Sequence, residues 1–257
     1  MVLKILTLNV SELKWPLGLK NREKRAKHIA KKILFMDSQP DVICFQQLFS
    51  PVAKETLTKL LKIEYPYSYI DPIGDKYYIG VNSGLAIFSK HCLLKKEMHY
   101  YKDHGKFARN GIMGVQIYQP DSKPTFIFTT CLQNNKKIFI FKNKTNMNTK
   151  FVKTEQLSEA KVFIDGFVDN PNSNVFITGN SNIKSTDAFL YPTLINILNV
   201  KDTFNHDKSV LDSSIRKSND RVDYILVENP ETVGYSYITI TFGENSDHRA
   251  VIGKFYI

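Results

Sequence analysis

The chain alternates between short apolar segments and longer amphipathic ones from its first residues to its last. Short apolar segments bounded by polar or turn residues are typical of buried β-strands. We predict strands at residues 3–10, 41–47, 84–89, 114–118, 125–132, 175–179, 222–227, 233–240 and 250–257. This distribution, with helical segments between the strands, predicts an α/β protein.

Three segments carry apolar residues at helical spacing instead. Asn21 is a predicted N-cap, and the helix after it has an apolar face made of Ala26, Ile29, Ala30, Ile33 and Leu34. Its other face is predicted to carry Arg22, Lys24, Arg25, Lys27, Lys31 and Lys32. Ser50 and Pro51 start a second helix as N-cap and first-turn proline, with inward-facing residues Ala53, Leu57, Leu60 and Leu61. A third helix places Leu157, Ala160, Phe163, Ile164 and Phe167 on one face.

The chain shows no division into separate units. We find neither an internal repeat nor a segment rich in Pro, Gly and Ser that would act as a linker. Residues 1–257 are therefore predicted to form one domain. Helices occur early and late while strands run throughout, which favours two sheets packed together with helices outside.

Composition narrows the class of protein further. With 257 residues, 42% of them hydrophobic, the chain is predicted to fold without a disulfide or metal staple. No apolar run approaches a membrane-spanning length, and the N-terminus turns polar by Asn9, too early for a secretory signal. Cys44, Cys92 and Cys131 fit no zinc motif, so we expect free thiols in a reducing compartment. An intracellular location is the expectation.

The charge is strongly basic. Lys and Arg total 35 against 25 Asp and Glu, which gives +10 and a pI of about 9.3. Such a surface attracts nucleic acid, anionic lipid headgroups or acidic proteins, or it simply keeps the protein soluble. Between Gln133 and Thr154 the chain has no acidic residue and six lysines: Lys136, Lys137, Lys142, Lys144, Lys150 and Lys153. The apolar residues 138–141 inside this stretch are either a core anchor or a contact with a membrane or partner.

Polar side chains end most of the predicted strands. For any one of them, a turn or capping role is an adequate explanation. As a set they are predicted to converge on one rim of a two-sheet core, where binding sites are commonly built. The set comprises Asn9, Gln47, Cys131, Asn180, Asn182, Asp223, Asp247 and His248.

The same segments resemble the endonuclease/exonuclease/phosphatase superfamily, and within it the neutral and bacterial sphingomyelinases. They follow the family order: TLNV at 7–10, WPLG at 15–18, DVICFQQ at 41–47, SGLAIFS at 83–89, ARNG at 108–111, RVDYI at 221–225 and SDH at 246–248. The matches extend from about Leu3 to Phe255. The resemblance implies the fold of deoxyribonuclease I, a four-layered α/β/β/α sandwich.

The resemblance also implies a chemistry, Mg²⁺-dependent hydrolysis of phosphoric esters, and this chain departs from it at three positions. Gln47 replaces the family's metal-binding Glu, which Asn9 would assist. Cys131 replaces a His that hydrogen-bonds the phosphoryl oxygen, and Asn180 replaces an Asp that helps activate water. Asn182, Asp223, Asp247 and His248 are retained, and His248 matches the family's general base.

These departures favour a catalytically inactive member that binds a protein partner or an anionic ligand. A phosphate held near Asn9, Asn182 and His248 is one such ligand, and no cofactor is expected. One alternative is a residual Mg²⁺-dependent phosphodiesterase, sphingomyelinase-like or nuclease-like. A second alternative is a structural or self-assembling protein. The membrane-entering hairpin of secreted bacterial sphingomyelinases is not evident between Phe204 and Arg221, where apolar residues are few.

Overall fold

The fold was obtained as a computed structural model. It describes residues 1–11, 21–71, 82–103, 109–120, 122–134, 149–209, 211–215, 220–229, 231–239, 242 and 245–257. The WPLG segment at 15–18, Ala108 of the ARNG segment and the apolar quartet at 138–141 lie outside these ranges. So do Lys136, Lys137, Lys142 and Lys144.

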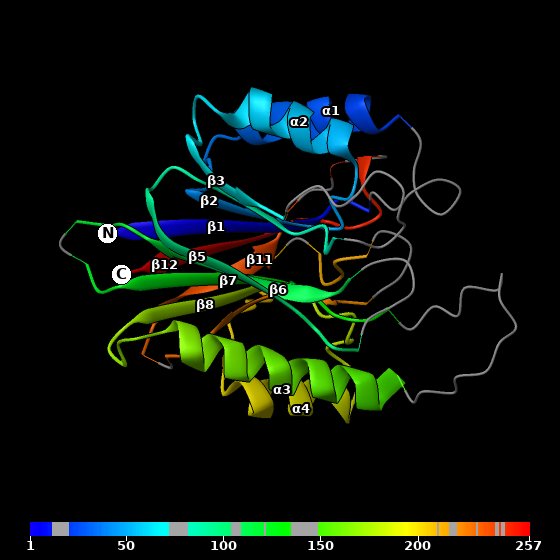
Figure 1. Cartoon of the computed structure of the whole chain (residues 1–257), viewed down its shortest axis with the longest axis vertical. Coiled ribbons are helices and arrows are strands. Elements are labelled where there is room, and N and C mark those ends of the chain that lie inside the picture. Colours follow the sequence, from blue (N-terminus) through cyan, green and yellow to red (C-terminus); the bar gives the residue numbers. More distant parts are fainter. Residues whose placement is uncertain are drawn as a thin grey trace, which may run out of the picture.

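Two six-stranded mixed sheets pack face to face, with helices on both outer faces (Figure 1). The first sheet has the order β11-β12-β1-β2-β4-β3, with bounds Val233–Ile238, Val251–Tyr256, Val2–Asn9, Val42–Gln46, Ala86–Ser89 and Tyr67–Ile70. The second has the order β5-β6-β7-β8-β10-β9, with bounds Leu93–Tyr100, Gly111–Ile117, Thr125–Cys131, Asn174–Asn180, Asp223–Val227 and Lys201–Asp202. The predicted α/β/β/α sandwich is confirmed.

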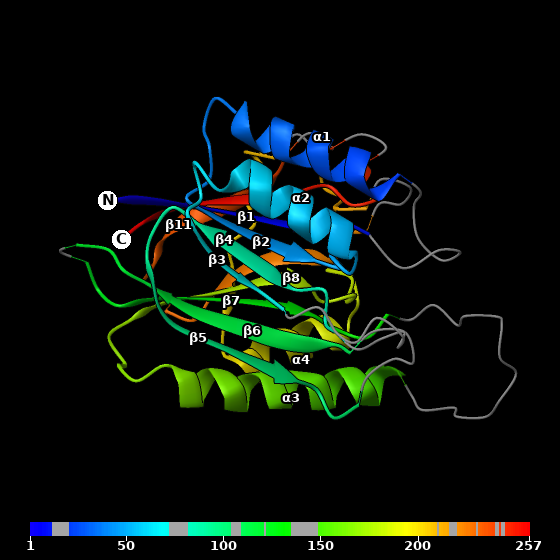
Figure 2. The same ribbon diagram turned by 45° about the horizontal axis from the view of Figure 1, so that its top comes forward.

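The helices form the two outer layers. Helices α1 (Arg22–Leu34) and α2 (Pro51–Leu61) cover the first sheet. Helices α3 (Thr149–Phe167) and α4 (Leu190–Leu198) cover the second (Figures 1 and 2). None of the helices in the described ranges is long and apolar enough to cross a membrane.

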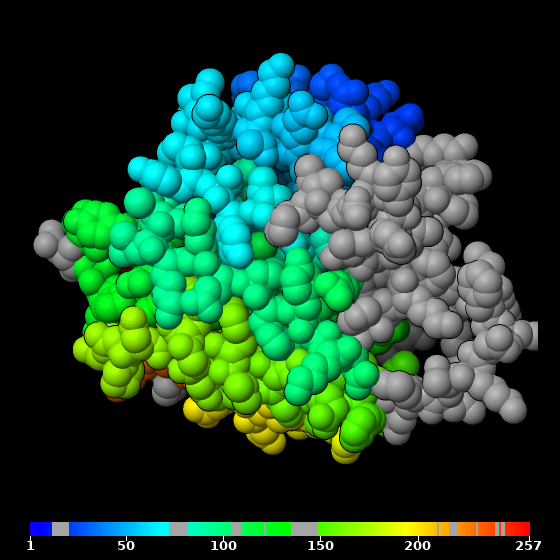
Figure 3. All heavy atoms as spheres, in the orientation of Figure 1, coloured from blue at the N-terminus to red at the C-terminus, as the bar shows by residue number. Residues whose placement is uncertain are grey.

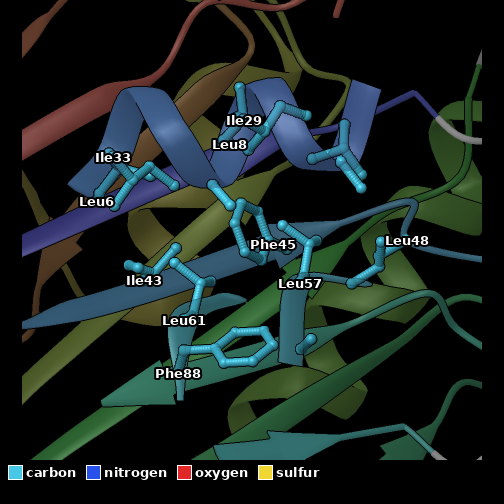
Figure 4. Packing of buried hydrophobic residues seen from close by; sticks show 14 of the residues in the cluster. Leu6, Leu8, Ile29, Ile33, Ile43, Phe45, Leu48, Leu57, Leu61 and Phe88 are labelled. Carbon is cyan, nitrogen blue, oxygen red and sulfur yellow. The ribbon is translucent and has the colours of Figure 1, made fainter. Parts of the chain in front are cut away.

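Three hydrophobic clusters separate these layers. One lies under α1 and α2, where Leu6, Ile43 and Phe45 of the sheet meet Ile29 and Leu57 of the helices (Figure 4). A second lies under α3 and α4, and a third fills the space between the sheets. Successive residues of β1 alternate between the first and third clusters, as the two-residue period of a strand requires.

The structure corrects several predictions for the helices. Ser50 caps α2 as expected, since its side chain accepts a bond from Ala53 N at 3.4 Å. Asn21 precedes α1 but forms no side-chain cap. Leu60 is 38% exposed rather than inward-facing, and Arg25 is buried rather than on the outer face. The third helix starts at Thr149, so the last part of the predicted basic loop is helical.

The first and last strands are neighbours. Strand β1 pairs antiparallel with β12, and Val2 lies opposite Tyr256. The N-terminal amine donates to Ile257 O at 2.8 Å. Strand β2 lies parallel to β1 on its other side, so both strands end at the same edge of the first sheet.

Candidate functional site

The topology brings the ends of four strands and the starts of two others to one rim of the sandwich. Strands β1 and β2 are parallel, and so are β7 and β8, so each pair ends on one edge. Strand β10 runs antiparallel to β8, which places its first residue, Asp223, opposite Asn180. The segment before β12 reaches the same edge because β12 is antiparallel to β1. Residues far apart in sequence therefore lie together.

A buried hydrogen-bonded chain joins the two sheets at this rim. His248 Nδ1 donates to Asp223 Oδ2 at 2.7 Å, and Asp223 Oδ1 accepts from Asn180 Nδ2 at 2.8 Å. His248 lies in the segment that leads into β12 of the first sheet, whereas Asp223 and Asn180 belong to the second. Asp223 and Asn180 are almost fully buried, and His248 is 8% exposed. The carboxylate of Asp223 thus fixes the orientation of the imidazole ring.

Cys131 completes the side of the rim that comes from the second sheet. It lies beside Asn180 in the parallel register, and its thiol donates to Asn180 Oδ1 at 3.9 Å. Burial raises the pKa of this thiol to about 12, with a further rise from Asp223 and a partial offset by a hydrogen bond with Gln47. Cys131 is therefore a neutral thiol at physiological pH.

The first sheet contributes Asn9, Gln47 and Asp247. Ser11 N donates to Asn9 Oδ1 at 2.9 Å, and the Ser11 hydroxyl donates to Asp247 Oδ1. Ser246 Oγ donates to the backbone oxygen of Asn9 at 2.6 Å, which ties the segment before β12 to the end of β1. Asp247 keeps about half of its side chain exposed, and its Oδ1 lies 4.0 Å from His248 Nε2.

Two buried amide atoms at this rim have no hydrogen-bond partner in the described part of the chain. They are Asn9 Nδ2 and Gln46 Oε1. Because Asn9 Oδ1 is held by Ser11 N, the amide cannot turn over without losing that bond. Gln46 Nε2 is likewise fixed by Thr7 Oγ1 at 2.8 Å and Thr129 Oγ1 at 2.9 Å. A buried unpaired donor in a polar region marks a place for water or a polar ligand.

Asn182 lies one step away from this chain of contacts. Its Nδ2 donates to Leu132 O at 2.8 Å, next to Cys131. Its backbone oxygen accepts from Lys153 Nζ, an ammonium on a fully buried side chain of α3. Burial lowers the pKa of Lys153 to about 8, against an opposing effect of Asp187.

The backbone is strained at three of these strand ends. Ser11, Gln47 and Asn182 have φ values of 50°, 57° and 52°, in the left-handed region that residues other than glycine rarely occupy. Such strain is found preferentially where surrounding structure holds a functional site. Gln47 directly follows β2, and Ser11 and Asn182 lie two residues after the ends of β1 and β8.

The structure thus brings all eight predicted residues to one rim, and their chemical roles stay predictions. Sequence reasoning assigned no role at the site to Ser11, Ser246, Arg25 and Lys153. Arg25 Nε donates to Asn245 O at 2.9 Å, and its Nη2 donates to Val10 O, so α1 holds both segments of the rim. The sequence did contain a signal for the burial of Arg25, since it shares a four-residue spacing with Ile29 and Ile33 on the buried face.

Comparison with known proteins identifies relatives of this chain. Three curated phospholipases C of Staphylococcus aureus were found, each 24% identical to this chain over 218 residues. The alignment covers 73% of this chain, and the chain spans about 62% of the length of these relatives.

Solved structures of similar shape cover the chain more completely. A beta toxin variant of Staphylococcus aureus with bound magnesium ions has a TM-score of 0.80 at 18% identity, covering 98% of this chain and 99% of its own. Sphingomyelinase C of Streptomyces griseocarneus has a TM-score of 0.76 at 17% identity, covering 99% of each chain. A family model described as the Endonuclease/Exonuclease/phosphatase family matches residues 6–248. The chain therefore belongs to this family.

Proposed function

We propose that this chain has lost Mg²⁺-dependent phosphodiester hydrolysis and uses the rim to bind an oxyanion of the phosphate type. The observation that carries the proposal is the orientation of the Asn9 amide. Its oxygen is occupied by Ser11 N, and the free buried atom is the N–H donor Nδ2. A cation takes oxygen ligands, whereas an oxyanion takes N–H donors.

The groups at the rim that could ligate a metal do not fit a magnesium ion. Mg²⁺ is usually held through one or two carboxylates. Both oxygens of Asp223 are already bonded, Gln47 supplies a neutral amide, and Asp247 is the remaining carboxylate among the predicted residues. Among the described residues, no group of three or more His, Cys, Asp and Glu side chains is placed to hold a metal.

The changes at Cys131 and Asn180 act in the same direction. A protonated thiol is a weak donor and cannot replace an imidazole at a phosphoryl oxygen. An amide donates to Asp223 and cannot accept a proton from water. Loss of one positioned acid or base costs ~10²–10⁴ in rate, and loss of an electrostatic stabiliser costs ~10²–10³. The three changes at Gln47, Cys131 and Asn180 therefore support the loss of activity, even if their effects on the rate do not multiply.

His248 would complete an anion site together with Asn9. Its Nδ1–H faces Asp223, so Nε2 is an acceptor while the ring is neutral and becomes a donor once the ring is protonated. A protonated ring at the same rim as the free Asn9 N–H would offer a second N–H donor to a tetrahedral oxyanion, which would compete for it with Asp247 Oδ1, 4.0 Å from Nε2.

Calorimetric titration with sulfate tests the anion site, because sulfate keeps its charge over the accessible pH range. Wild type should bind sulfate without Mg²⁺. The variant Asn9→Asp keeps the acceptor for Ser11 N but replaces the free N–H by a carboxylate oxygen, so it should lose sulfate binding. Equal binding by wild type and Asn9→Asp would contradict the proposal. A gain of Mg²⁺ binding by Asn9→Asp together with unchanged sulfate binding would assign the rim to a metal instead.

A residual phosphodiesterase is the second candidate, and one observation favours it. The Asp223–His248 pair is intact, with a 2.7 Å bond, and it is the arrangement that a general base requires. Hydrolysis of a phosphodiester that depends on His248 would separate this candidate from the inactive form.

A further inference from the structure

The two outer helical layers differ sharply in charge. Helix α1 holds six Lys and Arg residues and one acid, and α2 holds two Lys and one acid. On the opposite face of the molecule, α3 holds three Lys and three acids, and α4 holds no charged residue. Most of the basic groups of α1 are exposed, including Lys24, Lys27 and Lys31. The excess positive charge of the helices therefore faces one side.

Large apolar side chains project into solvent at the C-terminal ends of the same two helices. Phe35, directly after α1, is 78% exposed, and Ile63, just after α2, is 90% exposed. Leu60, one turn before Ile63, is 38% exposed. Lys31 lies over the Phe35 ring at 6.0 Å, and the exposed Lys59 and Lys62 flank Leu60 and Ile63 along the chain. We call these six residues the helix-end surface.

Both parts of the helix-end surface lie at the same end of the molecule. The turn after α1 contacts the turn after α2, because Tyr65 Oη donates to Pro40 O at 2.9 Å. Figures 1 and 2 show α1 and α2 side by side over the first sheet, and Figure 3 shows them along the upper surface. Asp37, Asp41 and Glu64 are the acidic residues of these turns, and the four lysines at the two helix ends, Lys31, Lys32, Lys59 and Lys62, outnumber them by one.

The topology places the helix-end surface opposite the rim. Helix α1 starts beyond the end of β1 at the rim and leads to the start of β2, which is parallel to β1. Helix α2 likewise leaves the rim after Gln47 and ends before β3. Strand β3 is antiparallel to β4, which is antiparallel to β2, so β3 also starts at the far end. A partner on the helix-end surface leaves the rim open.

From this combination, we infer that the helix-end surface docks on a lipid bilayer that contains anionic phospholipids. Isolated apolar side chains that protrude among lysines match the depth and charge of a membrane interface. A nucleic acid would use the lysines but would leave Phe35 and Ile63 in water. A protein partner would bury a broader and flatter area than two protruding side chains offer. The rim would then face the aqueous phase, where a soluble oxyanion reaches it.

Vesicle co-sedimentation tests the docking surface directly. The full chain should bind vesicles of phosphatidylcholine and phosphatidylserine, more weakly at high salt, and should not bind vesicles of phosphatidylcholine alone. Phe35→Ser with Ile63→Ser should weaken binding by roughly tenfold or more, because each side chain loses its apolar insertion. Lys31→Gln, Lys59→Gln and Lys62→Gln together should also weaken binding by roughly tenfold or more.

Two matched variants carry the same changes on other faces. Phe151→Ser with Val162→Ser removes two apolar side chains of α3 that are 58% and 74% exposed. Lys102→Gln, Lys123→Gln and Lys201→Gln removes three exposed lysines elsewhere. Both should bind vesicles as wild type does. The inference is overturned if wild type ignores phosphatidylserine, or if the matched variants lose as much binding as the test variants. It is equally overturned if the chain binds DNA and Phe35→Ser with Ile63→Ser leaves vesicle binding unchanged.

Discussion

Replacing Asn180 by Asp places a second carboxylate against the buried carboxylate of Asp223. The variant therefore measures how much the neutral Asn180 amide contributes to the stability of the fold. Asn180 Nδ2 donates to Asp223 Oδ1 at 2.8 Å, and both side chains are almost fully buried. The variant Asn180→Asp replaces this hydrogen bond by two like charges at a similar separation. At an effective dielectric constant of about 20, two charges roughly 3.5 Å apart repel by about 5 kcal/mol. Uptake of one proton by the pair limits the cost to about 3–4 kcal/mol at neutral pH.

The loss of stability caused by Asn180→Asp is expected to grow as the pH rises. In the unfolded chain the new carboxyl ionises near pH ~4, whereas repulsion by Asp223 raises its pKa in the folded protein. Between these two pKa values the folded state holds the extra proton, so the stability of Asn180→Asp falls as the pH rises above about 4. Below pH ~4 both states are protonated and the penalty disappears.

Urea unfolding at pH 4.5 and pH 7.5 measures the effect. From pH 4.5 to pH 7.5, the free energy of unfolding of Asn180→Asp should fall by about 2–3 kcal/mol more than that of wild type. The control Asn170→Asp adds the same charge at an exposed position where an oxygen accepts from Asn172 N, and it should behave as wild type does. If Asn180→Asp and Asn170→Asp show the same pH dependence, the carboxylates do not face each other and the described rim is wrong.

Three further outcomes follow from buried polar groups. Arg25→Met should lower the free energy of unfolding by about 2–4 kcal/mol because it leaves buried carbonyl oxygens unpaired. Lys24→Met, at an exposed position of the same helix, should change it by less than about 0.5 kcal/mol. Denaturant unfolding checks both variants. Cys131 should resist iodoacetamide at pH 8 because its pKa lies at about 12, and mass spectrometry should find Cys92, the less buried cysteine, alkylated first. Lys153 should make wild type more stable as the pH rises from about 8 towards 10.5, since the lowered pKa disfavours the charged folded form; Lys153→Met should lack this rise in unfolding experiments.

The sequence predicted the fold because most strands and most helices carry a consistent pattern of apolar and polar residues. The elements that it missed are those whose pattern is weak. Strand β5 is an edge strand with a mixed sequence that includes Lys95 and Lys96, and β3 is only partly buried. Helix α4 contains Pro192 in its first turn, a position where proline is tolerated but which discourages a helical interpretation.

The sequence predicted those residues of the site that are polar and stand at the end of a predicted strand. The convergence of Asn9, Asn180, Asp223 and His248 follows from strand direction, which the family motifs imply. The supporting contacts of Arg25 and Lys153 were not predicted, because both were assigned to basic, solvated segments. Their burial depends on tertiary packing against backbone carbonyl oxygens, which no local pattern encodes. The single-domain organisation and the intracellular location stay predictions.

The central claim is that the rim binds an anion without catalysing hydrolysis, and one turnover measurement tests it most directly. Purified wild type, with millimolar Mg²⁺, is assayed for hydrolysis of sphingomyelin and DNA beside His248→Ala and the triple variant Gln47→Glu, Cys131→His and Asn180→Asp. We predict no hydrolysis by wild type above buffer, the same result for His248→Ala, and recovered Mg²⁺ binding in the triple variant. Activity that survives His248→Ala would come from a contaminant. Wild-type turnover that His248→Ala abolishes would contradict the account and establish a working phosphodiesterase.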